Sequence, residues 1–345
     1  MSIKLFTIED KEWDNIVAYF KEADIYYYRS YVRAFQIHGD GDPSLIYYKS
    51  GNVQAINVAM KREIILDGLE EKLYDLSTPY GYGGLLFDKK IEQNDMEKFN
   101  REYVEFCKEN KIVSEFVRFH PVNKNSLDCK KIYDVINLGK TVTMDLSSEE
   151  FIWSNIHSKN RNMIRKAQKN GIEIFCGRSP ELFEKFRLMY NKTMEKDNAA
   201  DYYYFSPEFY KSILNDLKNS ALIFYAEQEG KIIAMSIILY SKGQLHYHLS
   251  ASDIEYRNLA PTNLLLFDVA IWGAVNGYKT FHLGGGVGSH EDNLYKFKKS
   301  FYKGEDTQFS IGRKIFDAEK YKMLCNIRFK GETYDNVSFF PQYRY

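Results

Sequence analysis

The sequence predicts an α/β protein of two related domains, each with helices flanking a mixed, mostly antiparallel sheet. A length of 345 residues is long for one domain and sufficient for two hydrophobic cores. A strand–turn–strand pattern also occurs twice, at residues 44–58 and 221–237. In each copy a helix and a further strand follow, the strands at 114–119 and 279–283. We therefore expect domains at residues 1–145 and 146–317, followed by a tail at 318–345.

The two copies agree in residue type as well as in order. Ser44–Tyr48 aligns with Ala221–Tyr225, and after a short offset Gly51–Val58 aligns with Gly230–Ile237. Both segments place β-branched and aromatic residues on either side of a glycine turn, which is typical of a hairpin.

Helix starts are marked most clearly in the second half. Ser147 and Glu150 have the spacing of a capping box ahead of an apolar helix. Ser-Pro-Glu sequences at 179–181 and 206–208 each combine an N-cap serine with a first-turn proline, and we expect the second of these helices to run through 219. Pro261 begins a further helix that is expected to end before Gly277.

Composition excludes several classes of protein. Lysine plus arginine and aspartate plus glutamate each number 47, so no global charge attracts nucleic acid. The four cysteines form no C-x-x-C pair, which argues against a zinc site or a disulfide framework and fits a reducing compartment. No stretch has the pattern of a signal peptide or a membrane helix, so we expect a cytoplasmic protein.

A glycine-rich segment, 282–288, joins the strand expected at 279–283 to a helix. We expect this helix to bury Leu294, Phe297 and Phe301 and to expose its lysines. Glycine lets a ligand approach the main chain, and the N–H groups at a helix start can bind a negative group or a developing oxyanion. The segment therefore predicts a binding or catalytic site.

The pattern L-G-G-G, an aspartate and L-x-x-F-K-x-x-F across this segment resembles the Fem family of peptidyltransferases (FemA, FemB and FemX type). The resemblance implies two tandem domains of the acetyltransferase fold known as GNAT, over about residues 1–317. It also implies transfer of an amino acid from the 3′ end of an aminoacyl-tRNA to an amine of a lipid- or nucleotide-linked peptidoglycan precursor. The reaction would take place in the cytoplasm or at the inner face of the membrane, without a metal or other cofactor.

The resemblance assigns roles to residues of this segment. Lys298 falls at the family's F-K position, where a cation beside the ester carbonyl would stabilise the oxyanion of a tetrahedral intermediate. Donor binding is expected from Gly284, Gly285, Gly286 and Phe297.

Two histidines alternate on a strand expected around residues 245–249. Either His246 or His248 can act as general base for the attacking amine, and we take His248 for this role. The alternative is a histidine without a catalytic part. No third ligand is evident nearby, so the spacing alone does not predict a metal site.

A basic segment at 158–171 has five lysines and arginines and no acid. Helical spacing places Arg161, Arg165 and Lys169 in one row. A solvated helix face is the plain interpretation. The segment also resembles the family's K-x-R-x-x-I-R-K-A helix, which implies contact with phosphates of the substrate or of tRNA.

Two loops bear on the identity of donor and acceptor. GNAT enzymes that use acetyl-coenzyme A hold its pyrophosphate on a loop of the form R/Q-x-x-G-x-G/A, whereas residues 257–262 read R-N-L-A-P-T and Pro261 lacks an N–H. This favours an aminoacyl-tRNA donor. By resemblance, residues 78–88 take the place of the family's Y-x-P-R-G-P-x-x-D stretch, so Tyr80, Tyr82 and Asp88 are expected to line the acceptor cleft.

Two other functions stay open. The first is a coenzyme A-dependent N-acyltransferase acting on a small amine, and the second is a paralogue that binds the precursor without catalysis. Binding of a coenzyme A thioester would indicate the first, and precursor binding without turnover the second.

Overall fold

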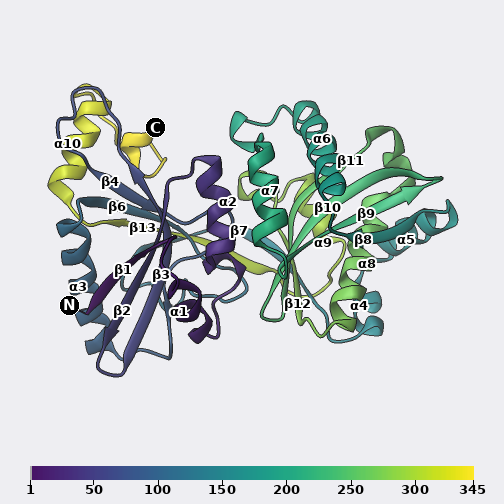
Figure 1. Ribbon diagram of the computed structural model, residues 1–345, viewed down its shortest axis with the longest axis horizontal. Helices are drawn as coiled ribbons and strands as arrows, with labels where there is room; N and C mark the ends of the chain where they lie inside the picture. Colours follow the sequence, from purple (N-terminus) through teal and green to yellow (C-terminus); the bar gives the residue numbers. More distant parts are fainter. Residues whose placement is uncertain (1) are drawn as a thin grey trace. The chain divides into compact units, whose positions relative to one another are not determined.

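The computed structural model describes residues 2–345, which form two compact units (Figure 1). Unit 1 contains the chain up to Leu138 together with Phe309–Tyr345, and unit 2 contains Gly139–Gln308. Both units have helices around a mixed, mostly antiparallel sheet, so the predicted α/β fold class is confirmed. No helix among residues 2–345 has the length and apolarity needed to cross a bilayer.

In unit 1 the strands are antiparallel to their neighbours except for one parallel pair, β4 with β6. The order across the sheet is β1 (Ile3–Thr7), β2 (Asp42–Ser50), β3 (Val53–Glu63), β4 (Tyr74–Ser77), β6 (Ile112–Arg118) and β13 (Thr307–Ile315). The short β5 (Leu86–Phe87) pairs with β3.

Helices cover both faces of this sheet. On one face lies α3 (Gln93–Glu109), whose Phe99 and Tyr103 are buried in a core with strand residues. On the other face lie α1 (Trp13–Tyr19) and α2 (Arg29–His38) (Figure 1). A separate apolar cluster joins α10 (Ala318–Arg328) to Val113 of β6 and to Ile64 and Leu73, which lie beside β3 and β4.

Unit 2 repeats this arrangement. Its order is β8 (Glu173–Gly177), β9 (Ala221–Gln228), β10 (Lys231–Ser241), β11 (Gln244–Ser252), β12 (Thr280–Gly284) and β7 (Asp134–Asp145), with β11 and β12 as the parallel pair. One face is covered by α4 (Glu149–Asn155), α5 (Ser158–Lys169) and α8 (Pro261–Val275), and the other by α6 (Pro180–Lys196) and α7 (Pro207–Asp216) (Figure 1). The helix α9 (Asn293–Lys299) follows β12.

The two hairpins that repeat in the sequence, β2–β3 and β9–β10, take equivalent places in the two sheets. The last strand of each sheet, however, comes from a distant part of the chain. β7 follows β6 in sequence but pairs with β12, whereas β13 follows unit 2 and pairs with β6. The compact units therefore differ from the expected domains at 1–145 and 146–317.

The segment 318–345, expected as a tail, packs into unit 1. Its anchor is the fully buried carboxylate of Asp75, which accepts hydrogen bonds from Tyr343 Oη over 3.1 Å and from Arg344 Nε over 2.5 Å. Arg62 pairs with the other oxygen of Asp75 over 2.7 Å. Two arginines and a tyrosine thus balance one buried carboxylate.

Helix starts agree with the sequence at three of four places. N-cap serines precede α6 and α7, and Pro261 begins α8, which ends before Gly277. The expected capping box is wrong by one residue, because Ser148 caps α4 and Ser147 bonds to Asp145 instead. The helix α7 ends at Asp216, three residues early, where the Arg178 guanidinium donates to the carbonyl oxygens of Leu214 and Leu217.

Candidate active site

The parallel pair β11–β12 of unit 2 is short. Its register begins at Gln244↔Thr280 and stops at His246↔His282, although β11 continues to Ser252 in pairing with β10. β12 ends two residues later, with a register shift against β7 between His282 and Gly284. The two strands therefore separate after His246, and the main chain of β11 beyond that residue has β10 as its only strand partner in unit 2.

Lys298 lies where these strands separate. Its Nζ donates to the carbonyl oxygen of Gly285 over 2.6 Å and lies 5.9 Å from the centroid of the Tyr247 ring on β11. The residue is 9% exposed, and burial lowers the pKa of its amino group to about 8, against the opposing charge of Asp292. An ammonium group has three donors, so two remain for a ligand.

The face of α9 that is buried differs from the expectation. Lys298 and Tyr295 are buried, whereas Leu294 is 40% exposed. Tyr295 Oη donates to Asp306 over 2.7 Å, and this bond holds the first turn of α9 against the chain beyond it. Phe297 lies beside the unit 2 core, with its ring 5.4 Å from that of Phe301.

The glycine segment is shaped by the side chain of Asp292, the N-cap of α9. Asp292 accepts from the N–H of Tyr295 over 2.8 Å and from the N–H of Val287 over 3.1 Å. A Cβ on Gly286 would lie 2.3 Å from this carboxylate, so only glycine fits there. Asp292 thus occupies the N–H of Tyr295, so this donor of the helix start is not available to an oxyanion. Gly284 and Gly285 lie against Lys298. A Cβ on Gly284 would lie 3.2 Å from Lys298 Nζ.

The histidines on β11 lie beside a bulge. β10 and β11 shift register between Ile237↔Leu249 and Ile238↔Tyr247, which leaves His248 as the extra residue. Burial, and then the neighbouring His246, lower the pKa of His248 to about 3. A base this weak takes a proton from an ammonium group poorly, so His248 is a poor candidate for a general base.

The basic row lies on α5, as the spacing predicts. Its guanidinium groups lie over the Trp153 ring, at 5.9 Å from the ring centroid for Arg161 and 5.0 Å for Arg165, while Ile164 of the same helix is buried. Arg165 and Lys169 are exposed. Trp153 thus holds Arg161 and Arg165 in place, and Arg165 and Lys169 are accessible to solvent.

The start of α8 has few main-chain donors to offer. Pro261 has no N–H, and the N–H groups of Asn263 and Leu264 turn back to the carbonyl of Ala260 at 3.2 and 3.4 Å. The Asn263 side chain donates to Asn160 on α5 over 2.8 Å. This turn is therefore poorly suited to hold a pyrophosphate.

The three residues expected in the acceptor cleft all lie in unit 1, but the structure brings only two of them together. Tyr80 stacks on Phe35 at 5.4 Å between ring centroids, and Tyr82 meets the rings of Tyr26 and Phe309, each at 5.7 Å. Asp88 is engaged elsewhere, since its carboxylate accepts from the N–H of Gln54 at the start of β3 over 3.0 Å.

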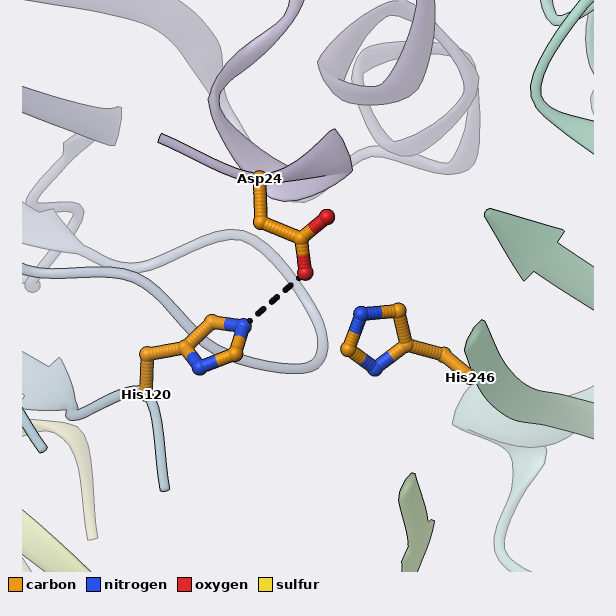
Figure 2. A group of neighbouring side chains, drawn as sticks. All are labelled: Asp24, His120 and His246. Atoms are coloured by element: carbon orange, nitrogen blue, oxygen red, sulfur yellow. Dashed lines mark hydrogen bonds and ion pairs between the residues drawn. The ribbon is translucent and has the colours of Figure 1, made fainter. Parts of the chain in front are cut away.

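A buried Asp–His pair lies next to Tyr82 and has no signal in the sequence, because its members are 96 residues apart. Asp24 and His120 point toward one another with Oδ2 and Nε2 at 3.0 Å (Figure 2). The N–H of Asn123 donates to His120 Nδ1, so the bonding assigns the proton to Nε2, which donates to Asp24. The pair ties the loop after β6 to the segment before α2, and the His120 ring lies 5.9 Å from that of Tyr82.

Comparison with known proteins shows which of these features belong to a known domain. A family model described as an acetyltransferase (GNAT) domain matches residues 154–299, which include α5, β11, β12 and Lys298. The predicted enzyme class, an acyltransferase, is thereby confirmed. A search of curated proteins gives no significant match.

Among solved structures, the crystal structure of FemX is similar to this chain with a TM-score of 0.69 at 13% identity, over 93% of this chain and 99% of FemX. A conserved protein of unknown function from Bacteroides thetaiotaomicron gives 0.58 at 13% identity, over 91% and 99% of the two chains. The C-terminal domain named for a lysylphosphatidylglycerol synthetase in Agrobacterium fabrum gives 0.52 at 14% identity, over 83% and 86%. At these identities the likeness establishes the fold, and it confirms the predicted resemblance to Fem-type proteins at that level.

Proposed function

We propose that the protein is an aminoacyltransferase that moves an amino acid from an aminoacyl-tRNA to an amine of a peptidoglycan precursor. The observation that carries the proposal is the Lys298 ammonium at the point where β11 and β12 separate. The GNAT match over residues 154–299 and the FemX fold support an acyl transfer of this kind.

In the proposed reaction the acceptor nitrogen attacks the ester carbonyl carbon and a C–N bond forms. Negative charge develops on the carbonyl oxygen, to which Lys298 donates a hydrogen bond. Collapse of the intermediate breaks the C–O bond to the terminal ribose, and the proton lost by the nitrogen passes to the leaving oxygen. Because the proton passes from the nitrogen to the leaving oxygen, this step does not require His248 as a general base.

The donor assignment is supported by the start of α8 and by α5. The turn at Ala260–Asn263 offers few N–H groups, which disfavours the pyrophosphate of coenzyme A. The exposed row of Arg165 and Lys169, continued by the half-buried Arg161, suits several separate phosphates of a tRNA 3′ end. We assign this row to the donor.

The acceptor assignment rests on unit 1. The partly exposed rings of Tyr80 and Tyr82, packed on the buried rings of Phe35 and Tyr26, form an aromatic wall suited to a sugar–peptide ligand. A precursor linked to a lipid would bring the protein to the inner membrane face, and one linked to a nucleotide would be met in the cytoplasm.

A coenzyme A-dependent N-acyltransferase is the second candidate, favoured by the description of the matching family as acetyltransferases. One experiment separates the two. The full-length protein is incubated with total charged tRNA and with purified lipid-linked and nucleotide-linked precursors, and product masses are read.

We expect the mass of one aminoacyl residue on a precursor, formed on the order of 100-fold more slowly by the Lys298→Met variant. A gain only with acetyl-coenzyme A would replace the proposal with the second candidate. Precursor binding without any mass gain would indicate a non-catalytic paralogue.

A further inference from the structure

Arg118 ends β6 of unit 1 and is fixed by the loop that follows β4. Its N–H donates to Thr78 Oγ1 over 3.1 Å, and its Nε donates to the carbonyl oxygen of Gly81 over 2.9 Å. The guanidinium carbon lies 5.3 Å from the centroid of the Phe309 ring. The backbone and the side chain of Arg118 are therefore both held by hydrogen bonds, which fixes the orientation of the guanidinium group.

The backbone at Gly81 sets this direction. Gly81 has φ of +95°, and a Cβ there would lie 2.5 Å from the Tyr26 ring, so the turn requires glycine for both reasons. The turn aims the Gly81 carbonyl at Nε of Arg118 and leaves the two terminal nitrogens, with four N–H groups, on the other side.

No acid neutralises this arginine. Among residues 2–345, no ion pair involves Arg118 and no hydrogen bond uses its two terminal nitrogens, although the residue is half-buried. Other arginines of unit 1 at similar exposure have carboxylate partners, such as Arg29 with Asp14 at 3.0 Å and Arg62 with Asp75 at 2.7 Å. A partly desolvated, unpaired charge costs stability, and an anionic ligand would recover that cost.

The charge of Arg118 acts on Tyr82 and Tyr26 of the aromatic wall. Burial raises the pKa of Tyr82, and the neighbouring guanidinium opposes that rise. Burial likewise raises the pKa of Tyr26, again with Arg118 in opposition. The unpaired cation thus lies beside Tyr26 and Tyr82, whose rings meet each other, and Tyr82 also meets Phe309.

We propose that Arg118 binds an anionic group of the acceptor, a carboxylate or a phosphate, next to Tyr82 and Phe309. The planar fork of its terminal nitrogens suits two parallel hydrogen bonds to either group. That the anion belongs to the acceptor rests on the proposed function, whereas the anion site itself does not.

The test follows the arginine side chains of the full-length protein, labelled with ¹⁵N, by NMR at constant ionic strength. Inorganic phosphate, acetate and chloride are titrated separately, and the Nε–H signal of Arg118 is assigned by its loss in Arg118→Lys. We expect this signal to shift saturably with phosphate or with acetate but not with chloride. Phosphate would indicate a nucleotide or lipid pyrophosphate as the source, and acetate a peptide carboxylate.

Affinity is followed in parallel through the backbone amide of Gly81. Arg118→Lys should weaken binding at least about tenfold, because the fork is lost while the charge is kept. Arg29→Gln is the matched control and should bind as the wild type does. The anion site would be refuted by a wild-type signal that does not saturate or that responds equally to chloride. An unchanged affinity in Arg118→Lys would also refute it.

The result is independent of turnover. Saturable anion binding without aminoacyl transfer in the product-mass assay would refute the proposed function and leave the anion site in place. Transfer without anion binding would refute the site alone.

Discussion

Replacing Lys298 by methionine should separate stability from catalysis. Lowering the pKa of the amino group from 10.5 to about 8 corresponds to a cost of about 3 kcal/mol for keeping the charged form in the folded protein at neutral pH. Methionine of similar length removes that cost but also removes the bond to Gly285, worth about 1.5–3 kcal/mol for a charged donor. We therefore expect a free energy of unfolding that is unchanged or higher by about 1 kcal/mol.

Turnover should respond in the opposite direction. Loss of one donor to a developing oxyanion lowers kcat on the order of 100-fold, with a smaller change in KM, because the contact acts mainly in the transition state. Lys299→Met is the matched control, since Lys299 pairs with Asp306 over 2.8 Å and is not placed at the opening between the strands. Steady-state kinetics and urea unfolding measure the two quantities. A destabilised Lys298→Met variant with normal kcat would refute the reasoning.

The pH dependence of kcat shows whether Lys298 acts as the ammonium ion or as the neutral amine. If the ammonium form stabilises the oxyanion, kcat should fall as the pH rises through about 8, the pKa of Lys298, and Lys298→Arg should lose this fall. The folded protein releases this proton at lower pH than the unfolded chain does, so stability should rise between about pH 8 and 10.5. A rate that increases through pH 8 would mean that the neutral amine acts instead.

Three further outcomes follow from other parts of the structure. Reversing Arg161 and Arg165 to glutamate should weaken binding of tRNA, with a smaller dependence of affinity on salt and an unchanged melting temperature; equal affinity would return α5 to an ordinary solvated face. Acetyl-coenzyme A should bind weakly or not at all, because the turn at Pro261 lacks N–H donors, and a low-micromolar Kd by calorimetry would contradict this. Arg344→Ala should destabilise the protein by on the order of 2 kcal/mol in thermal unfolding, because Asp75 stays buried with one guanidinium partner fewer; no loss would mean that the C-terminal anchor is unimportant.

Local signals in the sequence predicted local structure well. Ser-Pro-Glu sequences begin α6 and α7, since a serine side chain satisfies an N–H of the first turn and proline fits the position after it. The repeated hairpins are likewise visible because alternation and turn residues are encoded within a few positions. The GNAT match and the FemX fold confirm the resemblance drawn from the glycine segment.

Long-range pairing was not predictable in the same way. The alternation in β7 and β13 marks each as a strand but does not specify which neighbour it joins, so the exchange of these strands between the two sheets was missed. The same limit applies to Asp24 with His120, whose bond joins distant segments.

Within the candidate site, side-chain geometry decided what spacing left open. Asp292 belongs to the motif, and its carboxylate accepts from the N–H groups of Tyr295 and Val287, two donors whose engagement the spacing does not predict. Lys298 was identified by resemblance, whereas its burial against Gly285 and Tyr247 depends on how α9 packs. Arg118 carries no motif, and only the absence of an acidic partner among the described residues makes it noticeable.

The most direct test of the transfer site is a structure of the full-length protein with a stable donor analogue, an adenosine whose 3′ position carries an amino acid through an amide. We predict that its carbonyl oxygen lies about 3 Å from Lys298 Nζ, with the aminoacyl group between β11 and β12 beyond His246. An analogue bound in unit 1, or at the start of α8 without contact to Lys298, would contradict the assignment of this opening as the place of acyl transfer.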